Sequence, residues 1–261
     1  MSKELIPMSS DDIKRISLEI LDVVHSFCVE NQIKYSLIFG TMLGSIRHKG
    51  FIPWDDDVDI AMPREDYEKF ISTFSNDNYY VVSCKNNSKY YLPWAKVCDK
   101  NTYKKENTLH KFQIGFNIDV FPVDYIDSIE AFLDLRQKER KIIKNLNNAI
   151  FKSKSKIKNL VKKLFIVPRA NDFARKVDNM FVKKMSGRFS LINGIYNEDL
   201  KYLFEGDIFE ELILSPFEDK KYFCSSYYDE ILKTHYGKNY LEIPPYSSRK
   251  STHDFEAFLL K

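Results

Sequence analysis

Four aspartates are crowded into one short segment of the sequence. Asp55, Asp56 and Asp57 are consecutive, and Asp59 follows one residue later in the run WDDDVDI. Carboxylates this close repel one another unless a positive charge lies nearby. In an extended strand, residues two apart point the same way. The spacing therefore predicts that Asp57 and Asp59 share a face, with Asp55 just off its end and Asp56 on the opposite face in a structural role.

A second strand candidate, FNIDVFPVD, places Asp119 among alternating apolar residues. If this strand neighbours the first, Asp119 joins Asp57 and Asp59 on one face of the sheet. Clusters of carboxylate oxygens select hard divalent cations, Mg²⁺ or Mn²⁺. A pair of such ions can hold a phosphoryl group during an in-line displacement. An EF-hand loop counted from Asp55 is excluded, because its sixth and twelfth positions hold isoleucine and aspartate instead of Gly and Glu.

The segment FGTMLGSIRHKG precedes the aspartates and has the character of a phosphate-binding turn. It reads as the end of a strand, a glycine-containing turn and the start of a helix, which presents free backbone N–H groups to an anion. Gly40 and Thr41 are the expected contacts. Arg47, His48 and Lys49 follow at the exit of that helix, where they can neutralise phosphate charge. A D-x-D pair alone also occurs in glycosyltransferases, but there a nucleotide-binding βαβ half usually comes first, whereas here one helix precedes it.

The surrounding sequence indicates how these segments are positioned. Apolar residues at helical spacing predict a helix over 10–30 after a Ser-Ser-Asp-Asp start. Strands are expected over 35–40, 79–84 and 91–99, with a helix from the REDYEKF segment and a single helix over 219–237. We therefore expect an α+β fold, a mixed β-sheet core flanked by helices, with a helical insertion in the middle of the chain.

The motif GTMLGSIRHKGFIPWDDDVDIAMPREDYEKF closely resembles the signature of the LicD family, whose relatives include fukutin and the fukutin-related protein. The resemblance continues in AKVCDKNT, NIDVFPVD and the C-terminal YYDEILKTHYGKNYLEIPP, so it covers nearly the whole chain. It implies a nucleotidyltransferase-like core over residues 1–126. A helical region over 127–200 is the least family-like part, and a C-terminal segment, 201–261, packs back on the core.

The resemblance also implies an activity, namely transfer of a phosphorylated alcohol from a CDP-activated donor to a glycan hydroxyl with release of CMP. Phosphocholine from CDP-choline is the expected group, and ribitol or glycerol phosphate are alternatives. The acceptor would be a glycan or lipid-linked glycan of teichoic acid, lipopolysaccharide or capsule. Asp57 and Asp59 would hold two Mg²⁺ ions, with Asp55 as a further ligand. Asp119 would bind the second ion and accept the proton of the attacking hydroxyl.

Other residues are expected to complete the site. A choline headgroup suits a cage of aromatic faces, for which the candidates are Trp54, Tyr90, Tyr91 and Trp94. Packing in the core is the alternative for each of these aromatic side chains. The family's C-terminal pattern falls on Arg249 and His253, which either reach the site or belong to a structural tail. Glu218 is also family-like, and the sequence assigns it no role.

The segment 136–163 is rich in Lys and Arg and contains a single acid, Glu139. It is expected to be one basic helix that is either a solvated face or contacts an anionic membrane or polymer. The 261-residue chain has a formal net charge of only +3 and lacks an aromatic-interleaved basic motif, so nucleic acid is not an expected partner.

The N-terminus lacks an apolar leader, and the four cysteines form no metal-binding spacing. We therefore expect free thiols in a cytoplasmic protein, peripheral at most to the inner face of the membrane. Two alternative functions remain open, a nucleotidyltransferase that releases pyrophosphate and a binding module without turnover.

Overall fold

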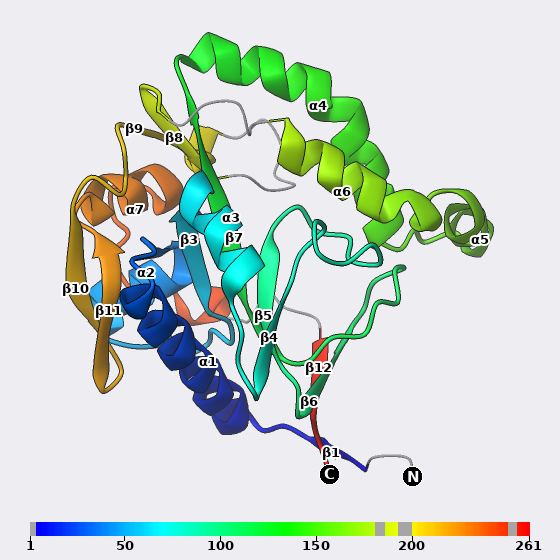
Figure 1. Cartoon of the computed structure of the whole chain (residues 1–261), viewed down its shortest axis with the longest axis horizontal. Coiled ribbons are helices and arrows are strands. Elements are labelled where there is room, and N and C mark those ends of the chain that lie inside the picture. The colour runs from blue at the N-terminus through cyan, green and yellow to red at the C-terminus, as the bar shows by residue number, and fades with distance from the viewer. Residues whose placement is uncertain (1–3, 181–185, 193–199, 250–254) are drawn as a thin grey trace.

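The computed structural model describes residues 4–180, 186–192, 200–249 and 255–261. It confirms the α+β class (Figure 1). The central sheet runs in the order β2-β3-β7-β5-β4, and β8 pairs with β7 and with β9. The strands of this sheet are β2 (Ser36–Leu37), β3 (Asp59–Pro63), β4 (Tyr79–Val82), β5 (Ala95–Asp99), β7 (Asn117–Ile126), β8 (Phe189–Ile192) and β9 (Leu203–Glu205).

The sheet is mixed, and its register sets the positions of the site residues. β3 and β7 are parallel, with Asp59 opposite Asp119. β5 and β7 are antiparallel, with Lys96 opposite the same Asp119. Paired residues on adjacent strands project from the same face, so one carboxylate from each parallel strand and one ammonium from β5 form a row across the sheet.

Two helices pack on the sheet and lie in front of it in Figure 1. α1 (Ser10–Glu30) begins with a complete capping box between Ser9 and Asp12, as the Ser-Ser-Asp-Asp sequence predicts. It buries an apolar stripe that includes Ile16, Ile20 and Val24. α3 (Arg64–Thr73) follows β3 directly after Pro63 and packs on β3 and β7.

The C-terminal part of the chain forms a hairpin and a short helix beside α2 (Phe39–His48). The hairpin pairs β10 (Leu212–Phe217) with β11 (Lys220–Ser225), and α7 (Tyr228–Tyr236) follows. The prediction of one helix over 219–237 is therefore wrong in its first half. The KKYFCS segment alternates sides along β11, and cross-strand pairing with β10 outweighs its helical tendency.

A small antiparallel sheet joins the two ends of the chain in the order β1-β12-β6. β1 (Leu5–Pro7) and β6 (Thr102–Glu106) pair with either side of β12 (Phe255–Leu260), which places Lys104 opposite Ala257. None of these three strands is predicted from the sequence, because each is short and its partner lies far away in the chain. The four cysteines are all free and buried, as expected.

The expected helical insertion is present, but its basic segment is not one helix. α4 (Ile129–Ile150) and α5 (Lys156–Phe165) are separated by residues 151–155, because the Ser155 side chain caps a new helix by accepting a hydrogen bond from the Lys158 N–H. α6 (Ala170–Asn179) follows and packs along α4. Single 3₁₀ turns lie at Val167–Arg169 (η1), Leu200–Tyr202 (η2) and Tyr246–Ser248 (η3).

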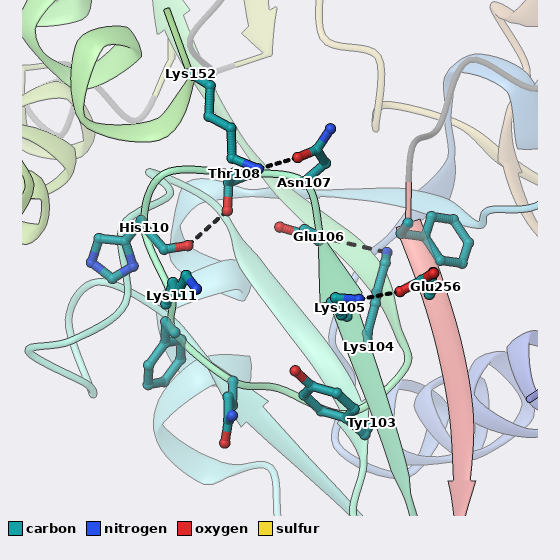
Figure 2. A pocket seen from close by; sticks show the side chains of 13 residues that line it. Tyr103, Lys104, Lys105, Glu106, Asn107, Thr108, His110, Lys111, Lys152 and Glu256 are labelled. Carbon is teal, nitrogen blue, oxygen red and sulfur yellow. Dashed lines mark hydrogen bonds and ion pairs between the residues drawn. The ribbon is translucent and has the colours of Figure 1, made fainter. Parts of the chain in front are cut away.

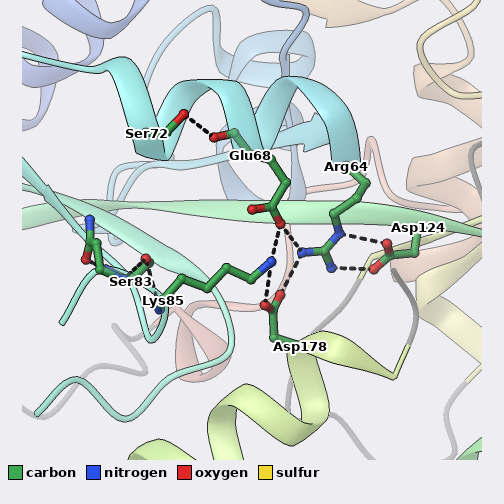
Figure 3. A network of polar contacts seen from close by, with 8 residues as sticks. Arg64, Glu68, Ser72, Ser83, Lys85, Asp124 and Asp178 are labelled. Atoms are coloured by element: carbon green, nitrogen blue, oxygen red, sulfur yellow. Dashed lines mark hydrogen bonds and ion pairs between the residues drawn. The ribbon is translucent and has the colours of Figure 1, made fainter. Parts of the chain in front are cut away.

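A buried ionic network fixes this helical region to the core (Figure 3). The Arg64 guanidinium, at the start of α3, makes two hydrogen bonds to Asp124 of β7, at 2.8 and 2.6 Å. Its remaining terminal nitrogen reaches Asp178 of α6 at 2.6 Å. Lys85 and Glu68 extend the network. Because Arg64 is almost fully buried, these contacts hold α6 against the sheet at a defined position.

Among the described residues, no helix combines the length and the apolar character that a bilayer-crossing segment requires.

Candidate active site

The row of residues across β3, β7 and β5 contains the chemistry of the site. Lys96 Nζ forms an ion pair with Asp119 Oδ1 and a 3.1 Å hydrogen bond to Asn117. The Trp94 indole N–H donates to the other Asp119 oxygen at 3.2 Å. The parallel pairing places Asp59 beside Asp119. Asp59 and Asp119 therefore lie side by side on adjacent strands, and a cation site shared by Asp57, Asp59 and Asp119 stays a prediction.

The aspartate run itself is not a strand up to Asp59. β3 begins at Asp59, and residues 55–58 form an extended loop before it. Alternation between two faces does not apply to such a loop. One carboxylate oxygen from each of Asp55, Asp56 and Asp57 lies within 4.8 Å of the others. The expectation that Asp56 points away from the acidic cluster is wrong for this reason, and Asp56 is a further candidate ligand.

The electrostatics of Asp59 indicate that the acids form one cluster. Burial raises the pKa of its carboxyl well above the usual range, and the neighbouring charges of Asp57, Asp119 and Asp55 raise it further. Among the main influences on this pKa, only the charge of Lys96 lowers it. Asp55, Asp57, Asp59 and Asp119 are four carboxyl groups, and the ammonium groups near them are those of Lys96 and, across the cavity, Lys104. Oxygen ligands, excess negative charge and close spacing together fit a divalent cation such as Mg²⁺.

Lys96 remains protonated in this setting. Burial alone would lower its pKa, but the charges of Asp119 and Glu106 and the hydrogen bond to Asp119 together outweigh burial, and the net shift is upward. Sequence reasoning missed Lys96. The signal was a single lysine inside an otherwise apolar strand, WAKVC, where a charged side chain is buried only with a partner.

The first turn of α2 contacts the aspartate run. α2 begins at Phe39, so Gly40 and Thr41 lie in its first turn and not in a turn before the helix. A Cβ at Gly40 would come within 2.7 Å of Asp55 Oδ2, so glycine is needed for this close approach. The Thr41 hydroxyl accepts a 2.8 Å hydrogen bond from the Asp59 backbone N–H. Thr41 thus fixes the backbone where β3 begins, and a phosphate contact from Gly40 and Thr41 remains a prediction.

The three basic residues at the C-terminal end of α2 lie in different surroundings. Arg47 donates hydrogen bonds to the carbonyl oxygens of Tyr240 and Glu242 at 2.9 and 3.0 Å. His48 has a lowered pKa because of burial and of the adjacent Arg47 charge. Lys49 is exposed and donates to the Ile46 carbonyl oxygen at the end of α2. Arg47 therefore anchors the C-terminal segment in this structure, and the phosphate contacts of all three remain predictions.

Glu218 has a clear structural role that the sequence did not reveal. One of its carboxylate oxygens accepts a hydrogen bond from the Phe51 N–H at 2.9 Å, and its own N–H donates to the Lys49 carbonyl oxygen at 2.7 Å. A Cβ at Gly50 would come within 2.2 Å of the Glu218 carboxylate. The hairpin turn between β10 and β11 therefore clamps the segment that leads from α2 into the aspartate run.

A cavity of about 350 Å³ opens onto the acidic cluster. Asp57, Lys96 and Asp119 line one side of it. Lys104 and Glu106 of β6 face them from the other side, and the sequence analysis missed both. Burial and the charge of Lys96 lower the pKa of Lys104. Aromatic and polar side chains complete the wall, namely those of Asn107, Thr108, Asn117, Phe151 and Phe255.

A second cavity of about 430 Å³ adjoins the first along β6 and the loop that follows it (Figure 2). The two share Lys104, Glu106, Asn107, Thr108 and Phe255 as lining residues. Further lysines, two aromatic rings and an imidazole line the second cavity, from Tyr103, Lys105, His110, Lys111, Phe112 and Lys152. Together the cavities form one groove that begins at the carboxylates and continues along β6.

The four aromatic candidates for a choline cage separate into two groups. Trp94, Tyr90 and Tyr91 are buried next to the row of site residues. Trp94 stacks on Phe121 with ring centroids 5.1 Å apart, and the Tyr91 hydroxyl donates to Glu106 at 2.8 Å.

Trp54 belongs to the other group. The Arg249 guanidinium lies over its ring at 5.4 Å, and its ring also contacts His48. His253 lies outside the described residues.

With this geometry established, comparison with known proteins identifies the family. The model of the LicD/FKTN/FKRP nucleotidyltransferase domain matches residues 32–171, more than half of the chain. The chain belongs to the LicD family. The matched span contains the aspartate run, Lys96, Asp119 and the wall formed by β6, so the predicted LicD-type enzyme is confirmed at the level of the family.

Comparison with individual proteins gives further similarities. The chain is 27% identical to the lipopolysaccharide cholinephosphotransferase LicD of Haemophilus influenzae, over 94% of its own length and 96% of that protein. An uncharacterized protein of Rickettsia typhi is 31% identical over 46% of this chain and 38% of its own length. An uncharacterized protein of Rickettsia prowazekii is 44% identical over 20% of each chain.

Proposed function

We propose that this LicD-family protein is a phosphotransferase that moves phosphocholine from CDP-choline to a sugar hydroxyl of a cell-surface glycan and releases CMP. The named activity of the Haemophilus relative, aligned over nearly the full length of both chains, supports the choice of group and acceptor class. Lipopolysaccharide is the acceptor that this relative suggests, and teichoic acid and capsule are further acceptors of the same chemical class.

One observation carries the proposal, the pairing of Asp59 and Asp119 on adjacent parallel strands beside Asp55 and Asp57. These carboxylates are the residues that would hold Mg²⁺ or Mn²⁺, and two ions are consistent with their number. When bound, such ions neutralise phosphate charge and lower the pKa of a coordinated hydroxyl. Without a cation, this concentration of buried negative charge would only cost stability.

The residues of the chain have distinct roles in the transfer. The acceptor hydroxyl oxygen forms a bond to the choline-bearing phosphorus, and the bond from that phosphorus to the CMP oxygen breaks. The hydroxyl proton passes to a carboxylate of the cluster, for which we propose Asp119. Lys96 and Trp94 hold that carboxylate by donating to one oxygen each, so its orientation is set before substrate binds. Lys104 lies across the cavity, where it can balance charge on the departing CMP.

The cavity wall also offers a choline subsite that differs from the predicted cage. Glu106 supplies a carboxylate, and the Phe151 and Phe255 rings line the same cavity. The Lys104 ammonium lies 4.4 Å from the centre of the Phe255 ring, so Lys104 would have to move away from this ring when the trimethylammonium group binds there. Tyr91 supports Glu106 from behind through its hydroxyl. We propose that Glu106, Phe151 and Phe255 contact the trimethylammonium group, with Tyr91 and Trp94 as their supports.

A donor screen with defined products tests the function. The protein is incubated with Mg²⁺, a glycan acceptor, and CDP-choline, CDP-ribitol or CDP-glycerol. Release of CMP that is fastest with CDP-choline is the expected result. CMP release with CDP-ribitol or CDP-glycerol alone would show that ribitol or glycerol phosphate, and not phosphocholine, is the transferred group. Pyrophosphate release from a nucleoside triphosphate would indicate a nucleotidyltransferase.

The same assay distinguishes the proposed site from other acidic groups. Asp59→Asn and Asp119→Asn should each lower turnover by at least about a thousandfold, because each removes a ligand or proton acceptor from the reacting centre. Asp134→Asn is the matched control, since Asp134 pairs with Lys138 on the exposed face of α4. Equal rates in all three variants would exclude the acidic cluster as the catalytic centre.

A further inference from the structure

Helix α5 exposes an apolar stripe that nothing in the described structure covers. Ile157, Leu160, Val161, Leu164 and Phe165 recur at the spacing of one helix face, and their exposed fractions range from 49 to 77%. The helix contains no buried residue. In Figure 1 it projects at the edge of the molecule, beyond α4 and α6. An amphipathic helix whose apolar face is this open normally binds that face to something else.

Polar contacts at its first turns, and not core packing, hold α5 in place. Asn159 exchanges hydrogen bonds with the backbone of Ser153 at 2.7 and 2.8 Å. Lys162 donates to the Phe151 carbonyl oxygen at 3.2 Å. A ten-residue helix has little intrinsic stability in water. These contacts fix the helix in an orientation that presents the apolar stripe outward.

The charge around the stripe identifies the partner. Lys156 and Lys158 flank it on either side, and Lys162 and Lys163 follow on the opposite face. The sequence contains no Asp or Glu between Glu139 and Asp172. A second copy of this chain docking through the same face would bring lysines against lysines. An anionic lipid surface satisfies both features, because the apolar side chains enter the boundary between headgroups and acyl chains while the lysines contact the headgroups.

The position of α5 links this face to the catalytic groove. Phe151, at the end of α4, lines the cavity beside the aspartates, and Lys152 lines the adjoining cavity. The Leu109 N–H donates to the Ile150 carbonyl oxygen at 2.6 Å, which ties the groove's loop to the same turn. Only residues 152–155 separate this rim from α5.

We propose that α5 is an interfacial helix that docks the protein on an anionic bilayer with the groove opening near the lipid surface. The docking itself does not depend on the reaction, whereas its use in presenting lipid-linked acceptors rests on the proposed phosphotransferase function. The structure thereby assigns membrane contact to α5, and not to the whole basic segment 136–163. Within α4, Arg136 and Glu139 are buried against each other and face no lipid.

Vesicle co-sedimentation tests the docking. The full chain is mixed with vesicles of phosphatidylcholine alone, or of phosphatidylcholine with phosphatidylglycerol. Binding should be at least tenfold tighter to the anionic vesicles and should weaken with salt. The variant Leu160→Ser/Leu164→Ser should lose at least tenfold in affinity. Leu214→Ser/Leu241→Ser is the control, because both leucines are more than half exposed elsewhere on the molecule, and it should bind as the original chain does.

Several results would overturn the proposal. One is equal sedimentation with neutral and anionic vesicles. Another is unchanged binding by the α5 variant. A third is a lipid-free dimer that the α5 variant dissociates, which would make a second copy the occupant. CMP release from CDP-choline in the presence of a soluble acceptor should be unchanged in the α5 variant, so a failure of docking and a failure of the phosphotransferase function are read separately.

Discussion

Lys96 and Asp119 face each other in the antiparallel pairing of β5 and β7, and their side chains form an ion pair where the cavity beside the aspartates meets the sheet. The ammonium is nearly inaccessible to water, with 5% of its side chain exposed. The site therefore carries a permanent cation of its own beside the carboxylates that we expect to bind metal ions. This fixed charge orients Asp119 and reduces the repulsion among the acids.

Replacement of Lys96 should impair catalysis more than folding. Lys96→Gln keeps a polar side chain next to Asp119 but removes the charge that orients it. We expect turnover to fall at least about a hundredfold, measured as CMP release, while circular dichroism still shows a folded protein. Lys138→Gln, which breaks an exposed pair on α4, should change neither. Retention of more than half of the turnover by Lys96→Gln would contradict a role for this ion pair.

The acidic cluster should lower stability in the absence of metal ions. Asp59→Asn replaces a buried carboxyl group, whose pKa is raised by burial and by its acidic neighbours, with an uncharged amide. In buffer with EDTA, we expect this variant to melt a few degrees above the original chain. Added Mg²⁺ should raise the melting temperature of the original chain by mass action, and should have little effect on the variant. The measurement is a thermal shift with and without Mg²⁺, and a lower melting temperature for Asp59→Asn in EDTA would count against a strained cluster.

The Arg64 network should be a major contribution to the attachment of the helical region. Arg64→Met removes the guanidinium from the buried Asp124 and leaves Asp178 with Lys85, which costs about 3–5 kcal/mol. Urea unfolding measures this loss. The triple variant Arg64→Met/Asp124→Asn/Asp178→Asn should recover most of it, since no charge remains unpaired. Arg15→Met, which removes pairs on the exposed face of α1, should cost less than about 1 kcal/mol.

Stability should also depend on pH through Glu139 of α4. Burial raises the pKa of this carboxyl to about 7, against the partial compensation of Arg136. The folded chain therefore binds this proton more tightly than the unfolded chain, and stability should fall as pH rises from about 4.5 to about 7. The effect is on the order of 3 kcal/mol once the carboxyl is ionised.

The comparison with Glu139→Gln isolates that group. The difference in unfolding free energy between the original chain and this variant should change across that pH range and level off above it. A constant difference between pH 4.5 and 8 would show that Glu139 does not titrate in this window.

The sequence predicts the parts of the site that depend on local patterns. The alternation placed Asp59 and Asp119 on strand faces, whereas the pairing of the two strands was a condition of the prediction and is a finding of the structure. Asp56 was misplaced because strand periodicity was applied to a loop. Lys96 and Lys104 were missed because their significance depends on which strands lie beside them, and β6 acquires its place only through pairing with β12.

The sequence did not reveal the structural roles of Glu218 and Arg47, because both residues act through contacts to distant parts of the chain. Glu218 contacts Phe51 across most of the chain, and Arg47 contacts carbonyl groups near residue 240. Neither partner carries a sequence signal, because a backbone group is the same at every position. The predicted helix over 219–237 is wrong in its first half for a related reason, since pairing with β10 decides the conformation of β11.

The pairing of β6 with β12 has a consequence for synthesis on the ribosome. Lys104 and Glu106 are translated early, yet the strand that fixes them against Ala257 and Phe255 emerges about 150 residues later. Contacts of such long sequence separation form slowly. The nascent chain can therefore assemble the aspartate cluster well before the opposite wall of the groove exists, and a polypeptide that stalls before β12 would expose these carboxylates without a closed cavity beside them.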